Sequence, residues 1–324
     1  MNVFITGATG FIGCHVVKRL ADTEHKLICL ARPTSDVSEL EEQDVTIIRG
    51  DVTDKDSLLE GMKGCQWVIN LANLYSFWEP DKRIFTDVNV TGTRNVMECA
   101  LETGIAKVVH VSTAGIYGKP AECPFCEDNP VGPERFSEYF RTKYEGDLIA
   151  WEMHEKKGLP LLMIYPVGVL GPGDPKASGR YIQDLIHHRV PARVLEDSIF
   201  TFVHVRDVAE AIVRAAEKEN NIGEKYLVGK HQLSWREINR MVSEISGVAL
   251  PKMRLPDFLT MFNARFLTLV ANVIKKPPLW GMAIDQIRTM KEGFVIDGSK
   301  AEKELGISYT PIRVALEEAI ASYR

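Results

Sequence analysis

The sequence predicts an α/β fold, in which a doubly wound parallel sheet carries a smaller C-terminal lobe. Two observations predict the sheet. Short apolar runs alternate with amphipathic segments at short intervals through the first half of the chain, a pattern typical of parallel strands joined by helices. The first apolar run is followed by glycines at three-residue spacing, where a strand would turn into a helix. The alternation stops beyond about residue 172, which predicts the separate lobe.

The main domain is expected to consist of two separate segments of the chain. We expect residues 200–228 to return to it, with Phe200 to His204 and Lys225 to Val228 as strands of the main sheet. The predicted domains are 1–172 for the main domain, and 173–199 with 229–324 for the lobe and C-terminal helices.

The N-terminal stretch MNVFITGATGFIG predicts a nucleotide-binding turn. Val3 to Ile5 forms a short apolar strand, and a helical pattern over about residues 11–21 begins inside the glycines. This order sets free backbone N–H groups and the positive end of a helix against a pyrophosphate. The residues expected to contact a dinucleotide here are Gly7, Thr9, Gly10, Phe11, Ile12 and Gly13.

The end of the second strand bears on which dinucleotide binds. His25 to Leu30 reads as that strand, and Arg32 follows it where an NAD-selective fold has an acidic residue for the ribose 2′-hydroxyl. A guanidinium suits a 2′-phosphate, so NADP(H) is favoured, while the nearby Asp36 leaves NAD(H) open.

The next two strands, Val45 to Ile48 and Gln66 to Leu71, also end in candidate contacts. Asp51 could reach an adenine amino group or could cap the following helix, a role that Asp54 could fill equally well. The residues predicted to line the cofactor at these strand ends are Asp51, Val52, Leu71 and Ala72.

The residues that carry chemistry follow a fifth strand, Lys107 to Val111. Tyr139 and Lys143 stand four apart on one face of a helix expected over about 137–157. An ammonium one turn from a phenol would lower the phenol's pKa from about 10, so that Tyr139 could exchange a proton with a substrate oxygen. Thr113, just after the fifth strand, could hydrogen-bond the same oxygen.

These motifs together resemble the extended short-chain dehydrogenases/reductases, the epimerase/dehydratase family with a Rossmann-type fold. The resemblance covers nearly the whole chain and includes Pro166 and the run to Asp174, which match the segment beside the nicotinamide. It implies that Thr113, Tyr139 and Lys143 are catalytic, that Lys143 also holds the nicotinamide ribose, and that Pro166 and Val169 contact the cofactor. It further implies a homodimer through long helices at about 82–103 and 137–157.

Within that family the chain looks most like the dihydroflavonol-reductase-like branch, which includes hopanoid-associated sugar epimerases. The segments YSFWEPD, NVTGTRNVM and KASGR carry this likeness. Nucleotide-sugar enzymes have an Arg and an Asn where this chain has Tyr165 and Gly168, which disfavours a nucleotide-sugar substrate. The prediction is therefore an NAD(P)-dependent oxidoreductase. The alternatives are a sugar epimerase or dehydratase that retains its cofactor, and a non-catalytic protein that senses the cofactor.

The lobe contains one strongly apolar helix. Asp257 to Ile274 reads as a lobe helix that covers an apolar substrate pocket, with a peripheral membrane contact as the alternative, since Lys275 and Lys276 end it. Polar residues within it argue against a spanning helix.

Composition and charge limit the classes of partner and the cellular compartment that we expect. The net charge of −5 with no basic block predicts no nucleic-acid partner. The first strand begins at residue 2, from which we expect a cytoplasmic protein that acts on a small molecule. No metal site is predicted. Cys123 and Cys126 read as loop thiols, with a redox or metal role as the lesser alternative, and the pair His187-His188 points to different helix faces.

Overall fold

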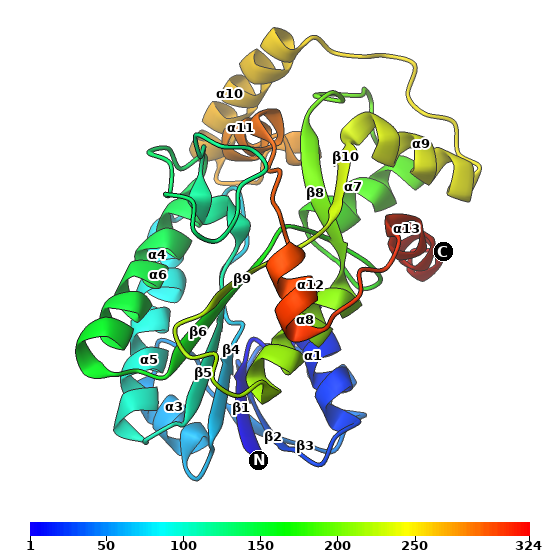
Figure 1. The fold of residues 1–324 in the computed structure, drawn as a ribbon. Helices are drawn as coiled ribbons and strands as arrows, with labels where there is room; N and C mark the ends of the chain where they lie inside the picture. The colour runs from blue at the N-terminus through cyan, green and yellow to red at the C-terminus, as the bar shows by residue number, and fades with distance from the viewer.

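The computed structural model describes all 324 residues. Its main element is a seven-stranded, wholly parallel sheet with spatial order β3-β2-β1-β4-β5-β6-β9 (Figure 1). The order reverses between β1 and β4, which opens a crevice at the carboxyl ends of those strands. The strands are β1 (Asn2–Thr6), β2 (Lys26–Ala31), β3 (Val45–Arg49), β4 (Trp67–Asn70), β5 (Lys107–Val111), β6 (Leu161–Pro166) and β9 (Lys225–Val228).

Helices cover both faces of this sheet, which explains the unbroken apolar strands. Along β1, Val3 and Ile5 face the core under α1 and α8, whereas Phe4 faces the core on the opposite side. One face is covered by α1 (Phe11–Ala21) and α8 (Val205–Glu217), with the short α2 (Ser38–Glu41) at the edge, and the other by α3 (Lys55–Met62), α4 (Arg83–Thr86), α5 (Thr93–Glu102) and α6 (Glu138–Lys157).

The helix expected over 82–103 is interrupted by a π-helical turn, Asp87–Gly92, between α4 and α5. Close packing explains the small residues there. A Cβ on Gly146 of α6 would lie 2.4 Å from the carbonyl oxygen of Asn89, and one on Gly92 would lie 2.6 Å from Val52. The segment therefore packs tightly on α6 and on the loop after β3.

The sequence prediction for Phe200 to His204 was wrong. These residues form β8 (Ile199–His204), which lies in a second, three-stranded sheet between β7 (Gly168–Leu170) and β10 (His231–Ser234). An apolar run specifies a buried strand but not its neighbours, and the antiparallel pairing with β10 takes β8 out of the main sheet. Lys225 to Val228 does return to the main sheet, as β9 beside β6.

The remaining helices build the lobe above the sheet and close the chain. The 3-10 turns are Ala114–Tyr117 after β5 and Leu279–Gly281 in the lobe. The helices are α7 (Ala177–Ile186), α9 (Trp235–Ser246), α10 (Asp257–Ile274), α11 (Ile284–Glu292), α12 (Ser299–Leu305) and α13 (Ile312–Ser322).

Candidate active site

A single cavity of about 1040 Å³ runs from the carboxyl ends of the main strands into the lobe. It brings together every site residue predicted from the sequence except Lys143. The predicted residues that line it are Gly7, Thr9, Gly10, Phe11, Ile12, Gly13, Arg32, Asp51, Val52, Leu71, Ala72, Thr113, Tyr139, Pro166 and Val169.

The glycine turn between β1 and α1 is shaped by backbone contacts that no side chain could replace. Gly7 has a φ of +69°, and a Cβ there would lie 2.6 Å from the carbonyl carbon of Leu71. A Cβ on Gly13 would lie 2.1 Å from the carbonyl oxygen of Gly7, so α1 can approach the turn only with glycine at this position. The turn is thereby held against the end of β4.

The start of α1 is open to an anionic ligand. Its N-cap residue, Gly10, offers no side-chain cap, and the first turn contains no acidic residue. The first N–H groups of the helix therefore face the cavity with the positive end of the helix dipole. This arrangement fits a dinucleotide pyrophosphate.

One end of the cavity is lined by the side chains after β2 and β3 that the sequence predicted as cofactor contacts. The guanidinium of Arg32 is exposed and has no ion-pair partner, whereas the carboxylate of Asp36 accepts a hydrogen bond from the N–H of Ser38 at 3.0 Å. Asp54 caps α3 through the N–H of Asp56. The capping role considered for Asp51 is thus filled by Asp54, and Asp51 lines the cavity.

The two adjacent hydroxyls after β5, of Ser112 and Thr113, make different hydrogen bonds. Ser112 is buried and donates to the carboxylate of Asp147 at 2.6 Å. Thr113 is only half-buried and accepts a hydrogen bond from the N–H of Gly115 at 3.3 Å, which leaves its own proton free to donate into the cavity. Thr113 is therefore the hydroxyl available to a ligand.

Tyr139 presents its phenol to the cavity from the first turn of α6, and its hydroxyl has no hydrogen-bond partner within the chain. Burial raises the pKa of this phenol, and the neighbouring Tyr75 and Asp147 raise it further. Tyr75 packs edge-on against Tyr139, with ring centroids 5.0 Å apart.

In the chain without ligand, the ammonium of Lys143 does not act on Tyr139 as the sequence predicted. Its side chain is only 1% exposed, it does not line the cavity, and its ammonium donates to the carbonyl oxygen of Val111 at 3.1 Å. Burial lowers the pKa of Lys143, which Asp147 partly offsets. The expected lowering of the Tyr139 pKa is thus absent here, because the ammonium is directed to a backbone carbonyl and desolvation of the phenol dominates.

A buried chain of hydrogen bonds crosses the sheet beneath the site. Thr6 donates to Asn70 at 2.6 Å, Asn70 and His110 lie 3.0 Å apart, and His110 and Asp147 lie 3.1 Å apart. Ser112 completes the chain on Asp147. Sequence reasoning missed this network, whose only signal was a polar residue within each of three apolar strands and one on the buried face of α6.

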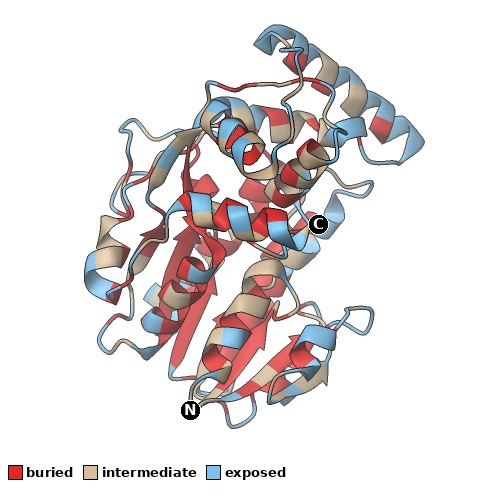
Figure 2. Cartoon of the chain, turned by 90° about the vertical axis from the view of Figure 1, so that its right-hand side faces the viewer, coloured by how far each residue is buried: buried red, intermediate tan, exposed pale blue.

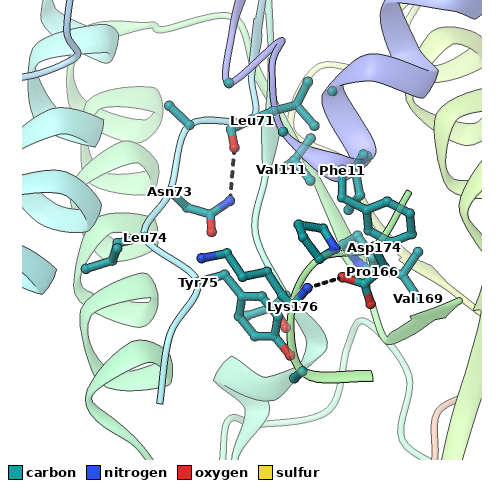
Figure 3. Close-up of a pocket in the computed structure, with 18 of the residues that line it drawn as sticks. Phe11, Leu71, Asn73, Leu74, Tyr75, Val111, Pro166, Val169, Asp174 and Lys176 are labelled. Carbon is teal, nitrogen blue, oxygen red and sulfur yellow. Dashed lines mark hydrogen bonds between the residues drawn. The ribbon is translucent and has the colours of Figure 1, made fainter. Parts of the chain in front are cut away.

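The other end of the cavity is aromatic. In Figure 3, Asn73, Tyr75 and Lys176 point into the space between the loop after β4 and the turn before α7. Asp174 and Lys176 are the only charged residues at this end, and both carboxylate oxygens of Asp174 accept backbone N–H bonds. The aromatic residues that line this end of the cavity are Tyr75, Phe77, Tyr139, Phe140, Tyr181, Phe200, Phe202, Trp235 and Phe294. Except for Tyr139, sequence reasoning did not assign these to the site, because they come from segments far apart in the chain.

The helix α10 does not line the cavity, so the expectation that it covers a substrate pocket was wrong. It packs instead on α11, whose residues Thr289 and Met290 form that wall. Elsewhere, Cys123 is exposed and Cys126 half-buried, both as free thiols, and no group of three potential metal ligands occurs in the chain.

Comparisons with known proteins identify the family and the fold. Residues 3–229 match the model of the NAD dependent epimerase/dehydratase family. Sterol demethylase protein B of Methylococcus capsulatus is 30% identical, over all of this chain and 98% of its own length. The crystal structure of gox2253 is 33% identical, with a TM-score of 0.86 over 99% of this chain and 97% of that one.

A more distant structure, DesIV (dTDP-glucose 4,6-dehydratase) from Streptomyces venezuelae with NAD bound, shares the fold. It is 23% identical, with a TM-score of 0.82 over 100% of this chain and 97% of its own. The family match spans the glycine turn, the strand ends and the Tyr139–Lys143 helix described above. The chain therefore belongs to the NAD-dependent epimerase/dehydratase family of extended short-chain dehydrogenases/reductases.

Proposed function

We propose that this protein is an NADP(H)-dependent oxidoreductase that interconverts an apolar carbonyl compound and its alcohol. One observation carries the proposal. The free hydroxyls of Tyr139 and Thr113 lie on the cavity wall between a phosphate-binding helix start and an aromatic chamber. A reacting carbon held between these two regions would meet both a cofactor and a proton donor.

NADPH held by the glycine turn and Arg32 would supply a hydride to the carbonyl carbon. Tyr139 donates its phenolic proton to the carbonyl oxygen as that oxygen gains charge, and solvent then reprotonates Tyr139. Burial keeps the phenol protonated at neutral pH, which suits a proton donor in the reducing direction. In the reverse direction the phenolate of Tyr139 takes the alcohol proton.

Thr113 orients the substrate oxygen in this proposal. One of its lone pairs is engaged by the N–H of Gly115, and its O–H is free to donate to the substrate oxygen. Two donors, from Thr113 and Tyr139, would then converge on one oxygen and stabilise its developing negative charge. Lys143 would take its expected role toward the nicotinamide ribose only after its ammonium turns from the carbonyl of Val111 toward the cavity.

The preference for NADP(H) is supported by the two candidate side chains after β2. Arg32 is unpaired and lines the cavity, whereas Asp36 is engaged by the backbone of Ser38. A guanidinium binds a phosphate through charge-assisted hydrogen bonds, which an engaged carboxylate would oppose only weakly.

The substrate class follows from the aromatic chamber. A nucleotide-sugar diphosphate needs cationic partners, and Lys176 is the only cation at that end. A bulky apolar ligand would bury its surface against the aromatic rings instead. The relative named for a sterol is consistent with such a ligand.

The test is turnover of NADPH with a panel of aromatic and alicyclic aldehydes and ketones. The Tyr139→Phe variant should lose about 10²- to 10⁴-fold in rate while it binds NADPH as tightly as the native chain. Tyr144→Phe, on the same helix but outside the cavity, is the matched control and should retain activity. Native rates in Tyr139→Phe would refute the proposed proton donor.

The same experiment separates the proposal from an epimerase or dehydratase. Such an enzyme regenerates its cofactor within each cycle, so it would show no net consumption of NADPH. A purified chain that carries tightly held cofactor and isomerises a sugar substrate would favour that alternative, which the family match equally supports.

A further inference from the structure

The helix α10 presents a continuous apolar stripe to solvent. Phe258, Phe262, Phe266, Leu269 and Val273 recur every three or four residues and therefore share one face. Their exposed fractions are 71%, 67%, 58%, 65% and 82%. Figure 2 shows this helix at the upper edge of the molecule, largely exposed, while the strands below are buried. An apolar stripe of this length on a folded chain indicates an interaction surface.

The opposite face of α10 packs against the rest of the protein. Thr260, Ala264 and Ala271 are buried. The hydroxyl of Thr268 accepts a hydrogen bond from the N–H of Ile284 at 2.9 Å, and the indole N–H of Trp78 donates to Asn272 at 2.9 Å. The helix has the length and mean hydropathy of a membrane-spanning segment, yet only one face is free. It can therefore lie on an apolar surface but cannot cross it while the fold is intact.

The charges beside the stripe point to the kind of surface. Arg265 lies at the edge of the apolar face, and Lys275 and Lys276 follow the helix, all exposed and none in an ion pair with a carboxylate. Between residues 258 and 280 the chain carries these three cations and no acidic residue, although its net charge is −5. Of the nearby acids, Asp81 pairs with Arg83, and Asp257 lies at the far end of the helix.

The segment after α10 adds two exposed apolar side chains. Leu279 and Trp280 are 62% and 63% exposed. A tryptophan beside cationic residues is typical of the boundary between lipid headgroups and acyl chains, because its ring is apolar while its N–H can remain hydrated. Apolar side chains with three cations and no acidic residue between 258 and 280 match an anionic bilayer better than a protein groove of mixed charge.

We propose that the stripe on α10, with Leu279 and Trp280, docks this protein on an anionic lipid bilayer. The apolar side chains enter the headgroup boundary, and Arg265, Lys275 and Lys276 contact lipid phosphates. The surface also lies close to the site. The α10 helix packs on α11 and contacts the loop that carries Tyr75 and Phe77, both of which line the aromatic end of the cavity.

Vesicle flotation with the full chain tests the proposal, using vesicles of phosphatidylglycerol and phosphatidylcholine against phosphatidylcholine alone. The native chain should float with the anionic vesicles, and high salt should weaken the association. The double variant Phe262→Glu/Phe266→Glu should lower the vesicle partition coefficient about 100-fold. Lys275→Glu/Lys276→Glu should lower it at least about 30-fold on anionic vesicles only, since about 1 kcal/mol is expected per cation near the surface and the variant lacks two of them.

Matched controls keep the outcome interpretable. Ile222→Glu replaces an exposed isoleucine on another loop, and Lys303→Glu reverses an exposed lysine on α12, so both should float like the native chain. Thermal unfolding of each variant checks that it is folded. Equal flotation of the Phe262/Phe266 variant and the native chain would overturn the proposal. A native chain that self-associates without binding anionic vesicles would also overturn it, if the Phe262/Phe266 variant no longer self-associates. A second copy of the chain would then cover the stripe.

Discussion

The substitution Gly13→Ala tests whether the backbone at the start of α1 holds the cofactor. The new Cβ would lie 2.1 Å from the carbonyl oxygen of Gly7 and 2.9 Å from the Cα of Ala8, whereas ordinary contact begins at 3.4 Å. The helix or the turn must therefore move by about 1.3 Å. Both neighbours are backbone, so no side-chain rotation relieves the clash.

A shift of this size misaligns the N–H groups that face the pyrophosphate. A hydrogen bond to a charged group is worth about 1.5–3 kcal/mol, so the loss of one or two predicts a dissociation constant for NADPH raised at least tenfold and up to about 10⁴-fold. Fluorescence titration with NADPH measures it, and thermal unfolding measures the accompanying loss of stability, about 1–3 kcal/mol.

The matched control is Gly104→Ala, at a glycine of φ +68° with no atom within 4 Å of its Cβ. It should cost about 1–2 kcal/mol of folding free energy through backbone strain while NADPH affinity stays native. If Gly13→Ala binds NADPH as the native chain does, the close approach of α1 to the turn is not what positions the phosphate site.

Further predictions concern cofactor choice, pH and assembly. Arg32→Ala should weaken NADPH binding about 10- to 100-fold and leave NADH binding unchanged; equal losses for both would exclude a 2′-phosphate contact. Burial, reinforced by Lys143, lowers the pKa of His110 below its ordinary 6.5, so the folded state favours neutral His110. The resulting stability is complete above about pH 6.5 and is lost as pH falls through the lower folded pKa; pH-dependent thermal unfolding should show this loss, and it should be absent in His110→Asn. Because burial raises the pKa of Tyr139, the reduction rate should stay flat from about pH 6 to pH 9 while alcohol oxidation rises with pH; a reduction rate that falls near pH 7 would show that the phenol pKa is lowered in the complex. Leu148, 51% exposed on α6, should lie in the expected homodimer interface, so Leu148→Asp should yield monomers in size-exclusion chromatography if that prediction holds.

Local patterns were enough to predict most of the main domain. The glycine spacing predicted the first turn, because such a turn depends on residues only a few positions apart. Six of the seven main-sheet strands were predicted in order from apolar runs, the sixth of them from Leu161 to Ile164, and β9 from its expected return. The pair Tyr139 and Lys143 was placed on one helix face by helical geometry alone.

Contacts between distant segments could not be predicted in this way. The register of β8 depends on β10, and the choice of Thr113 over Ser112 as the free hydroxyl depends on Asp147 from another helix. The direction of the Lys143 ammonium depends on the carbonyl of Val111. Each is a long-range hydrogen bond, which leaves no periodic signal along the chain.

The sequence by itself determined the fold family and the cofactor class, and it predicted the candidate reactive side chains, because each rests on a motif of fixed local spacing. Only the tertiary structure decided which apolar residues form the aromatic chamber and which remain exposed. Phe200 and Phe266 are alike as letters, but β8 turns one into the cavity, whereas α10 leaves the other in solvent. Burial is a property of the packed chain, so apolar composition could not distinguish a substrate wall from an outer surface.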